Sequence, residues 1–410
     1  MNLRQIPVQK GTFMKAGFFH DSQITIKDKH YFSKTLTPNV WNRYLEVFES
    51  LQVSTRVKSG ETDGLQSSET TGIEFAPITN YSNPSSLILH PFKVVSEIRT
   101  HIRKIDCAII RLPSFIGWIA CLLAQIHKVP VIIEAVGCPW DAYGNHSKLG
   151  KLFAPIARWL NQKCIANAPF VIYVTDDFLQ KRYPTRGVSA GISDVNIHSD
   201  LRNLKERIHR ISTQANAEHK FSNLERPIIL GSVGDVGLKY KGYQTSVDAV
   251  RLLIDEGINV EYQIVGPGNP AFLQSYIDSV GLSEVVHLVG PIPGNELKPW
   301  FQEVDIYLQP SLVEGLPRAV IEAMSFGLPV ILSNIGGHPE LVNKKFLFDV
   351  KDHRQLSKLI SSTMTLNQIE ISKTNFNTAS FYDVDKLTER RTEILNQFLE
   401  FSNQLQSRNL

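Results

Sequence analysis

The chain has 410 residues, more than one ordinary hydrophobic core requires, and this length predicts two domains. Hydrophobic residues make up 42% of the chain and charged residues 20%, which is typical of a folded globular protein and excludes bulk disorder. With 43 basic and 40 acidic residues the net charge is only +3, so a general nucleic-acid binder is excluded and we expect no nucleic-acid partner.

The four cysteines form no CxxC pair, so the sequence predicts reduced thiols and no zinc site. The N-terminus carries no basic, apolar and small-residue signal pattern. The most apolar predicted helix, residues 115–126, is shorter than the roughly 20 residues needed to cross a bilayer. We therefore expect a cytoplasmic protein without a membrane-spanning helix.

The first half of the chain alternates strand and helix patterns. Apolar runs predict strands at residues 14–20, 107–112, 129–137 and 168–175. Helical spacing predicts helices at residues 40–51 and 114–128 and from residue 176 onward. Such alternation favours a parallel sheet with both faces covered. We assign residues 1–190 to this first, acceptor-side domain.

Residues 191–226 are polar and charged, and we interpret them as the linker into a second domain. A second alternating series then predicts strands at residues 227–234, 260–266, 285–290, 304–310 and 328–334, with helices between them. We assign residues 227–375 to the second domain and residues 376–410 to a final helix. The fold class is α/β, with two doubly wound Rossmann-like domains facing a cleft at the carboxyl ends of their strands.

Residues 311–340, "SLVEGLPRAVIEAMSFGLPVILSNIGGHPE", place one glutamate before a predicted helix and another inside it. Gly315 lets the backbone approach a ligand, and Pro317 suits the first turn of a helix. The free N–H groups of that turn favour an anion such as a phosphate. Glu322 lies about five residues into the helix, roughly 7–8 Å along its axis at 1.5 Å per residue, and Glu314 lies on the other side of the helix start. The two carboxylates flank the anion position and can accept hydrogen bonds from hydroxyl groups. The pattern predicts a nucleotide-sugar site; the alternative is a surface helix with two solvated glutamates.

This stretch resembles the nucleotide-sugar signature of glycosyltransferase family 4, in its Glu–seven residues–Glu spacing and its later Gly-Gly pair. The resemblance continues over "WNRYLEVFESLQVSTRV" and "FVIYVTDDFLQKRYP", which are similar to capsule- and exopolysaccharide-type members. It implies a GT-B fold, with the last helix crossing back to the first domain. It also implies a retaining, metal-independent hexosyltransferase without a cofactor. The implied donor is a UDP- or GDP-sugar, and the acceptor a glycan or lipid-linked molecule in surface-polysaccharide assembly.

The resemblance also implies roles for particular residues. Glu314 would bind hydroxyls of the transferred sugar, and Glu322 those of the ribose. Backbone amides around Gly315, Leu316 and Arg318 would meet the diphosphate, while Gly336 and Gly337 would form the next tight turn.

Lys241 in "GSVGDVGLKYKGYQ" matches the family's Lys-Gly and would neutralise the departing diphosphate. The arginine that the family places upstream is replaced by Asp235, so Lys239 is a candidate substitute. Gly266, at the end of a predicted strand, and Ile292, in the turn 290–294 expected to contact the base, complete the donor-binding set.

In the first domain, the resemblance implies a glycine-bearing loop close to the donor phosphate, with Gly17 at its turn. His20 and His30 lie in or beside this segment, and we interpret both as ordinary surface histidines. His146, in the stretch "EAVGCPWDAYGNHSKLGK", is the candidate catalytic histidine near the donor sugar, with Asp141 as the alternative. We predict no protein nucleophile.

Residues 146–163 combine an apolar helical face with several basic side chains. A basic amphipathic surface can rest on an anionic bilayer, so peripheral contact with the inner face of the cell membrane is one interpretation. The other is an ordinary helix packed on its own sheet.

Two alternative functions belong to other classes. A nucleotide-dependent dehydrogenase would need a complete G-x-G-x-x-G fingerprint, which "VGDVGL" and "VGPGNP" lack. A non-catalytic nucleotide-sugar or glycan-binding subunit with the same fold would explain the missing arginine, but Glu314, Glu322 and Lys241 are all present.

Overall fold

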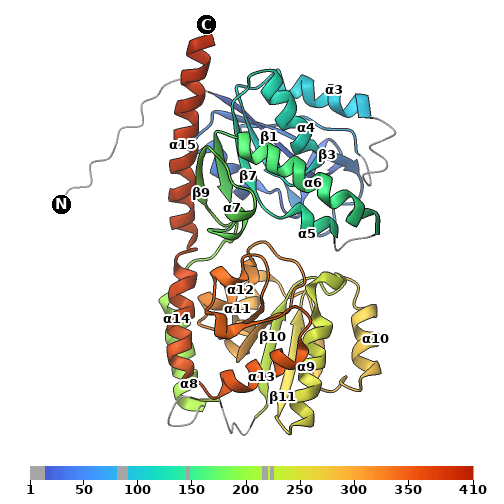
Figure 1. Ribbon diagram of the computed structural model, residues 1–410, viewed down its shortest axis with the longest axis vertical. Coiled ribbons are helices and arrows are strands. Elements are labelled where there is room, and N and C mark those ends of the chain that lie inside the picture. Colours follow the sequence, from blue (N-terminus) through green and yellow to red (C-terminus); the bar gives the residue numbers. More distant parts are fainter. Residues whose placement is uncertain (1–13, 81–90, 145–147, 215–219, 222–225, 410) are drawn as a thin grey trace, which may run out of the picture.

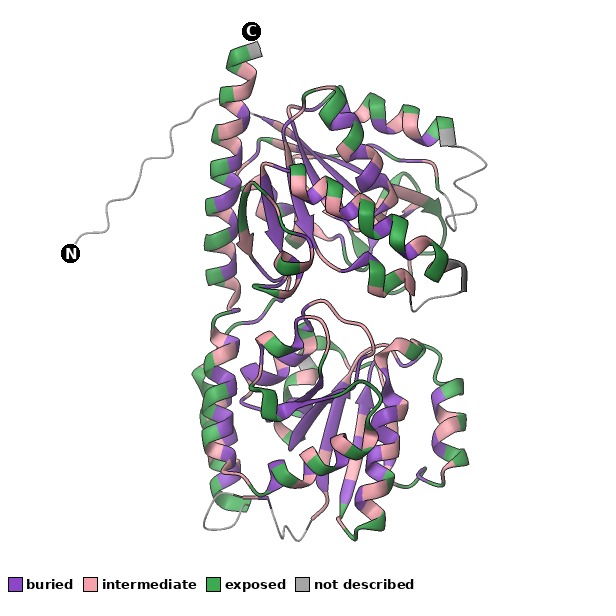
Figure 2. Ribbon diagram, viewed as in Figure 1, coloured by how far each residue is buried: buried purple, intermediate pink, exposed green. Residues whose placement is uncertain are grey.

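The computed structural model describes residues 14–80, 91–144, 148–214, 220–221 and 226–409. Two α/β domains are stacked along the long axis of the molecule, and the last helix runs along the side of the first domain (Figure 1). Strands form the buried centre of each domain, and helices expose their outer faces (Figure 2).

The described part of the first domain contains a nine-stranded, mostly parallel sheet. Its strands are β1 (Lys15–Lys27), β2 (His30–Ser33), β3 (Ser50–Ser59), β4 (Gln66–Ser67), β5 (Ile73–Phe75), β6 (Cys107–Leu112), β7 (Val131–Ala135), β8 (Phe170–Tyr173) and β9 (Val188–Gly191). Its helices are α1 (Pro38–Leu45), α3 (Pro91–Ile102), α4 (Phe115–Ile126), α5 (Pro139–Gly144), α6 (Lys148–Asn167) and α7 (Phe178–Arg182). Among the paired strands of this described part, β2 is antiparallel to both β1 and β4, and the other pairs are parallel.

Two expectations for the first domain are wrong. The predicted loop after residue 20 is strand, because β1 bulges between Phe19 and Gln23 and then continues to Lys27. Gly17 therefore lies inside β1 and not at a turn; a Cβ there would come within 2.5 Å of Ile105 Cδ1. The helix predicted at residues 40–51 ends at Leu45, because the following residues form the largely buried strand β3.

The second domain contains a six-stranded sheet in the order β12-β11-β10-β13-β14-β15, parallel throughout. Its strands are β10 (Ile228–Val233), β11 (Val260–Val265), β12 (Val286–Gly290), β13 (Ile306–Gln309), β14 (Val330–Ser333) and β15 (Leu347–Phe348). Its helices are α8 (Leu201–Gln214), α9 (Tyr243–Asp255), α10 (Ala271–Ser279), α11 (Gly294–Glu303), α12 (Arg318–Ser325), α13 (His353–Met364) and α14 (Gln368–Ser380). The five predicted strands and the helices between them are confirmed.

Helix α8 lies within the segment that the sequence predicts to be a linker. It packs on the second domain, where the buried Arg207 guanidinium donates to the carbonyl oxygens of Val304 and Asp305. The first passage of the chain between the domains, called here the interdomain connection, is therefore only the short stretch between β9 and α8.

Helix α15 (Val384–Asn409) crosses back to the first domain. It begins later than the predicted residue 376, because the residues up to Ser380 complete α14 in the second domain. The ring of Phe398 is buried against Phe48 and Phe170, with centroid distances of 6.4 and 5.5 Å. Within the described ranges, no helix combines the length and the apolarity needed to cross a membrane.

Candidate active site

Lys241 and Glu314 meet at the edge of the second sheet that faces the first domain. Lys241 belongs to the turn after β10 and Glu314 to the loop after β13, and Lys241 Nζ lies 3.0 Å from Glu314 Oε2. Their side chains are only 17% and 18% exposed. The carboxyl ends of adjacent parallel strands thus bring together two residues that lie far apart in the chain.

A chain of hydrogen bonds orients Glu314. Ser311 Oγ donates to Glu314 Oε2 at 3.1 Å, and Gln309 Nε2 donates to Ser311 Oγ at 2.8 Å. Tyr307 OH donates to Gln309 Oε1 at 3.0 Å and accepts from the backbone N–H of Val233 at 3.1 Å. Because Gln309, Ser311 and Tyr307 are buried, the carboxylate is held in place by the core of the domain.

The turn after β14 holds the backbone of the Glu314 loop. Gly336 has a φ of +53°, and a Cβ there would lie 2.1 Å from the carbonyl oxygen of Glu314. The N–H of Gly337 donates to the carbonyl oxygen of Gly315 at 2.7 Å. Only glycine allows this approach, so the Gly-Gly pair supports the site.

Gly266 is another position at which a side chain would not fit. A Cβ at this residue would lie 2.0 Å from the carbonyl oxygen of Gly234, so the turns after β10 and β11 pack backbone against backbone. The position predicted for donor binding is thus a point where two strand ends converge.

Helix α12 begins directly after this loop. Pro317 is its N-cap residue and supplies no side-chain hydrogen bond, which suits an external anion at the first turn. Arg318 is exposed at this turn, whereas Leu316 is buried. Glu322, one turn further, is half-buried; burial raises the pKa of its carboxyl, and the Arg318 guanidinium partly opposes this shift.

Glu322 lines a cavity of about 390 Å³ on the side of α12 that faces the interdomain connection. The cavity is lined by Asn196, Ile197, His198, Asn203, Gly294, Leu297, Lys298, Phe301, Glu322, Ser325 and Phe326. Gly294 ends the turn that the sequence predicts to contact the base. Ile292 itself is half-buried against the core of the domain. The predicted ribose and base positions therefore adjoin one cavity.

Other predicted residues lie elsewhere. The ammonium of Lys239 lies 3.9 Å from the ring centroid of Phe272 on α10, so the structure directs it toward that helix and not toward Glu314. Asp141 pairs with Arg182 at 2.6 Å, and His30 with Glu69 at 2.9 Å. His146 lies outside the described residues.

Sequence reasoning missed two residues of the "GGHPE" segment. His338 is fully buried, with Nδ1 2.6 Å from the carbonyl oxygen of Ser333 and with Nε2 lacking a hydrogen-bond partner. Burial lowers the pKa of His338 to about 4, so its imidazole is neutral at physiological pH. The available signal was a histidine directly after the Gly-Gly pair.

Glu340, the second missed residue, joins the two domains. Its carboxylate accepts from the backbone N–H groups of Asp176 and Phe178 at the start of α7, each at 2.7 Å. Nearby, a Cβ on Gly315 would lie 3.3 Å from the carbonyl oxygen of Val136 in the first domain. The Glu314 loop is thus bounded by both domains.

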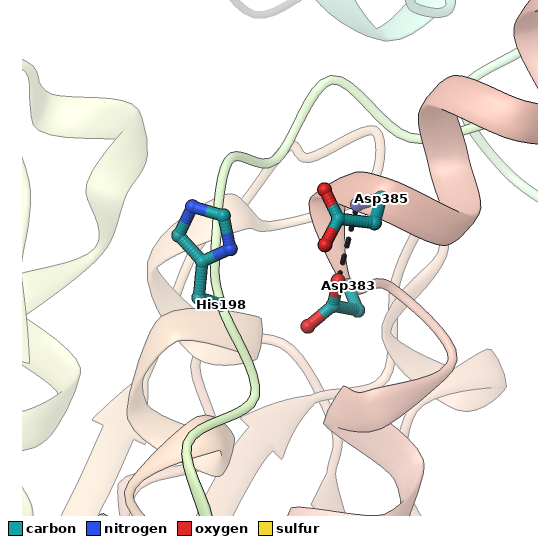
Figure 3. A group of neighbouring side chains, drawn as sticks. All are labelled: His198, Asp383 and Asp385. Carbon is teal, nitrogen blue, oxygen red and sulfur yellow. Dashed lines mark hydrogen bonds between the residues drawn. The ribbon is translucent and has the colours of Figure 1, made fainter.

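One group among the described residues has the composition of a metal site. His198, Asp383 and Asp385 have potential ligand atoms within 4.8 Å of one another, where the interdomain connection meets the start of α15 (Figure 3). Asp383 already accepts hydrogen bonds from the backbone N–H groups of Ser199 and Asp385, at 2.7 and 3.0 Å. The Asp383 carboxylate therefore joins the interdomain connection to the start of α15, and the metal-independent reaction stays a prediction.

Residues 214–378 match the family described as Glycosyl transferases group 1. Protein CapJ of Staphylococcus aureus is 30% identical over 390 residues, which cover 93% of this chain and 95% of that protein. The amylovoran biosynthesis glycosyltransferase AmsK of Erwinia amylovora is 40% identical over 126 residues, 29% of this chain and 31% of that protein.

A solved structure of HepE from Anabaena, described as a complex with UDP, is similar with a TM-score of 0.63 at 17% identity. The similarity covers 94% of this chain and 100% of that one, and it confirms the predicted two-domain GT-B fold. The family match spans the domain that holds Lys241, Glu314 and Glu322, and the match to CapJ extends over both domains. The chain belongs to the group 1 glycosyl transferase family.

Proposed function

We propose that this glycosyltransferase transfers a hexose from a UDP- or GDP-sugar to a glycan or lipid-linked acceptor during capsule or exopolysaccharide biosynthesis. The observation that carries the proposal is the pairing of Lys241 with Glu314 beside the cavity that Glu322 lines. The Lys241 ammonium and the uncapped start of α12 suit the phosphates of such a donor. The carboxylates of Glu314 and Glu322 suit the hydroxyl groups on either side of those phosphates. The names of CapJ and AmsK support the polysaccharide context, and the UDP complex of HepE supports the donor class.

In the proposed reaction, Glu314 accepts hydrogen bonds from hydroxyls of the transferred sugar, and the Lys241 ammonium faces the departing diphosphate. The bond between the anomeric carbon and the phosphate oxygen breaks as the bond to the acceptor oxygen forms on the same face. Because the acceptor attacks the face from which the phosphate departs, the configuration is retained without a protein nucleophile. The acceptor proton passes to the leaving phosphate. Lys241 stabilises negative charge as it develops on the phosphate.

The test is transfer from radiolabelled UDP- and GDP-sugars to lipid extracts of a polysaccharide-producing cell, with and without a chelator. We expect a labelled lipid-linked product from one donor, and equal activity in the chelator. Binding of a nucleoside diphosphate without transfer from any sugar conjugate would favour the non-catalytic binding subunit. Activity lost with the chelator would contradict the metal-independent mechanism.

A lipid-linked acceptor accounts for an exposed apolar strip on α6. Leu152, Ile156 and Trp159 are 76%, 53% and 55% exposed, and Lys151 and Arg158 lie beside them. Phe153 and Leu160 on the same helix pack into the core, so the helix is held by one face while the strip points outward. Apolar side chains among cations favour an anionic bilayer. We propose that this surface rests on the cytoplasmic face of the membrane.

Co-sedimentation with vesicles tests this surface. The protein should bind phosphatidylglycerol vesicles and not phosphatidylcholine vesicles, because the cations require anionic headgroups. The double substitution Leu152→Glu and Trp159→Glu should abolish binding, whereas Phe272→Glu, on exposed α10 of the second domain, should not. Equal sedimentation of all variants would contradict the proposal.

A further inference from the structure

A larger cavity lies in the first domain, between α4 and α6. Its volume is about 680 Å³, within the usual range of ligand sites. Small side chains at helical spacing line it, namely Cys121 and Ala124 on α4 and Cys164 on α6, and they leave space between the two helices. Phe401 and Leu405 of α15 complete the lining. We call this cavity the α4–α6 groove, and none of the proposed donor-binding residues lines it.

The α4–α6 groove lies at the edge of the first sheet opposite the donor site. Its lining includes residues 129–131, which lead into β7, and residues 167–169, which lead into β8. The other end of β7 faces the second domain, because a Cβ on Gly315 would lie 3.3 Å from the carbonyl oxygen of Val136. Helix α5, which follows β7, accordingly lies at the edge nearest the second domain (Figure 1). The five residues of β7 separate the two edges by about 17 Å.

Exposed apolar side chains flank the groove on both helices. Leu122 of α4 and Trp159 of α6 line it and are 59% and 55% exposed, and Ile126, one turn after Leu122, is also 59% exposed. Trp159 belongs at the same time to the apolar strip of α6 that is proposed to rest on the membrane. The groove therefore continues this strip, and such a contiguous apolar surface indicates a binding surface.

The charges around the groove have one sign. Lys128 and Lys163 line it and are exposed, whereas its described lining residues include no aspartate or glutamate, and neither do the sequences of α4 and α6. Lys128 also has a φ of +56° directly after α4, in the left-handed region that favours glycine. A lysine where glycine would be less strained suits a function of its ammonium group.

These charges decide among the possible occupants. In a symmetric dimer the groove would face the same surface of a second copy, so like charges would oppose each other. An apolar groove with cations at its rim instead matches a hydrocarbon chain with an anionic headgroup. Because the groove lies opposite the donor site, that headgroup would lie far from Glu314, which favours a lipid of the bilayer over the acceptor.

We propose that the α4–α6 groove binds one acyl chain of an anionic phospholipid, whose phosphate is met by Lys128 and Lys163. This site goes beyond the proposed function, because it requires neither donor nor acceptor. Together with the strip on α6, a lipid held in the groove would fix the first domain on the membrane while the opposite edge of its sheet faces the second domain.

Calorimetric titration with decyl phosphate, below its micelle concentration, tests the site without a bilayer. Wild type should bind one molecule per chain. Octyl phosphate should bind at least about 10-fold more weakly, since each buried CH₂ contributes about 4-fold. Lys128→Gly and Lys163→Ala should each weaken decyl phosphate about 3- to 10-fold, the scale of one cation beside an anionic headgroup. Decanol, which lacks the phosphate, should bind both variants as it binds wild type.

Lys128→Gly relieves the left-handed backbone, so lost binding in this variant does not come from unfolding. Lys351→Gly is the matched control, because Lys351 has a φ of +69° and lies outside the groove; it should bind as wild type does. The partly exposed thiols of Cys121 and Cys164 line the groove, so decyl phosphate should slow their modification by a maleimide about 10-fold. Mass spectrometry measures this protection.

Absence of binding, equal losses in Lys128→Gly and Lys351→Gly, or binding that protects neither thiol overturns the proposal. Tighter binding of geranyl phosphate, an isoprenoid with the same ten carbons, would assign the groove to an isoprenoid lipid and not to a phospholipid. A dimer that decyl phosphate dissociates would mean that a second copy occupies the groove. Since no measurement involves a nucleotide or sugar transfer, each of these results leaves the proposed function standing.

Discussion

At the scale of single residues, the Lys241–Glu314 pair decides how charge is distributed in the site. Ser311 and Lys241 both donate hydrogen bonds to the same carboxylate oxygen of Glu314, Oε2. Its second oxygen is left for a ligand hydroxyl. A diphosphate beside Lys241 would share the ammonium with Glu314, which links sugar binding to leaving-group stabilisation.

Lys241→Met should therefore reduce turnover more than donor affinity. We expect kcat to fall about 100-fold, the scale for one preorganised charge in a transition state, with KM changing by less than about 5-fold. Steady-state kinetics with the identified donor measures both. Lys239→Met is the matched control, because its ammonium lies over Phe272, and its kcat should stay within about 3-fold of wild type. Equal losses in the two variants would contradict the assignment.

Glu322→Ala should weaken binding of the nucleoside diphosphate by about 1.5–3 kcal/mol, the usual range for hydrogen bonds to a charged group. Since burial raises the pKa of Glu322, the carboxylate is lost at a higher pH than in an ordinary glutamate. Wild-type affinity should consequently decrease on acidification before ordinary carboxylates titrate. Titration calorimetry from pH 7.5 to 5 measures this, and an identical pH profile in Glu322→Gln would exclude Glu322 as the cause.

His338 predicts a pH dependence of stability. Its pKa in the folded protein is about 4, against 6.5 for an ordinary histidine, so between these values the unfolded state binds a proton that the folded state does not. The free energy of unfolding should therefore decrease as pH falls from about 6.5 to 4, by up to about 3 kcal/mol from this residue. Urea unfolding at several pH values should show a shallower decrease in His338→Gln. An unchanged slope would mean that other groups are responsible.

At the scale of elements, the second domain was predictable because its strands are continuous apolar runs that end at Gly or Pro. The first domain was less so. In β1 the polar residues His20, Asp21 and Ser22 interrupt the apolar pattern where the strand bulges, so the pattern indicates a loop there. Helix α8 was missed because buried polar residues, Asn203 and Arg207, occupy part of its inner face.

The candidate site likewise contains some residues that local sequence spacing reveals and others that only the fold brings together. Glu314, Glu322 and the Gly-Gly pair lie in one contiguous stretch, so local spacing was enough to find them. Lys241 required the resemblance to a family, since its proximity to Glu314 depends on the pairing of β10 with β13. Asn203 and the interdomain connection gave no local signal, because only the packing of α8 beside α11 and α12 brings them to the cavity.

The turn after β14 can be tested as an element. Gly336→Ala should force the turn away from the Glu314 backbone, since the added Cβ would lie 2.1 Å from a carbonyl oxygen at a φ of +53°. We expect at least about 10-fold lower kcat/KM and a lower melting temperature. Gly144→Ala is the matched control, because nothing lies within 4 Å of its Cβ position. Retained activity in Gly336→Ala would show that the loop tolerates the shift.

At the scale of the whole molecule, a charged cluster ties the crossing helix to the first domain. Asp194 in the interdomain connection accepts from Arg43 at 3.0 Å, from Arg391 of α15 at 3.3 Å, and from Arg111 of β6. Glu134 of β7 lies 3.7 Å from Arg111. The carboxylate of Asp194 therefore joins three guanidinium groups from separate parts of the chain.

Asp194→Asn should remove the carboxylate that three guanidinium groups share, while those three positive charges remain. We expect the free energy of unfolding to decrease by about 3 kcal/mol, the scale for breaking a largely buried ion pair. Chemical denaturation measures the change. Asp177→Asn removes an exposed pair with Lys181 and should cost less than about 1 kcal/mol. If both substitutions cost the same, the cluster contributes no more than a surface pair.

Because α15 returns to the first domain, that domain is built from two separate segments of the chain. This limits the ways in which two genes of the family can recombine. A single crossover between two related genes would join a first domain to a foreign α15, separating Phe398 from Phe48 and Arg391 from Asp194. Two crossovers, near residues 200 and 382, would instead exchange the second domain as an internal cassette. The boundaries of such a cassette enclose residues 214–378, the segment that matches the family. The second domain, with Lys241, Glu314 and Glu322, can thus be exchanged as one insert, while the first domain keeps both of its segments.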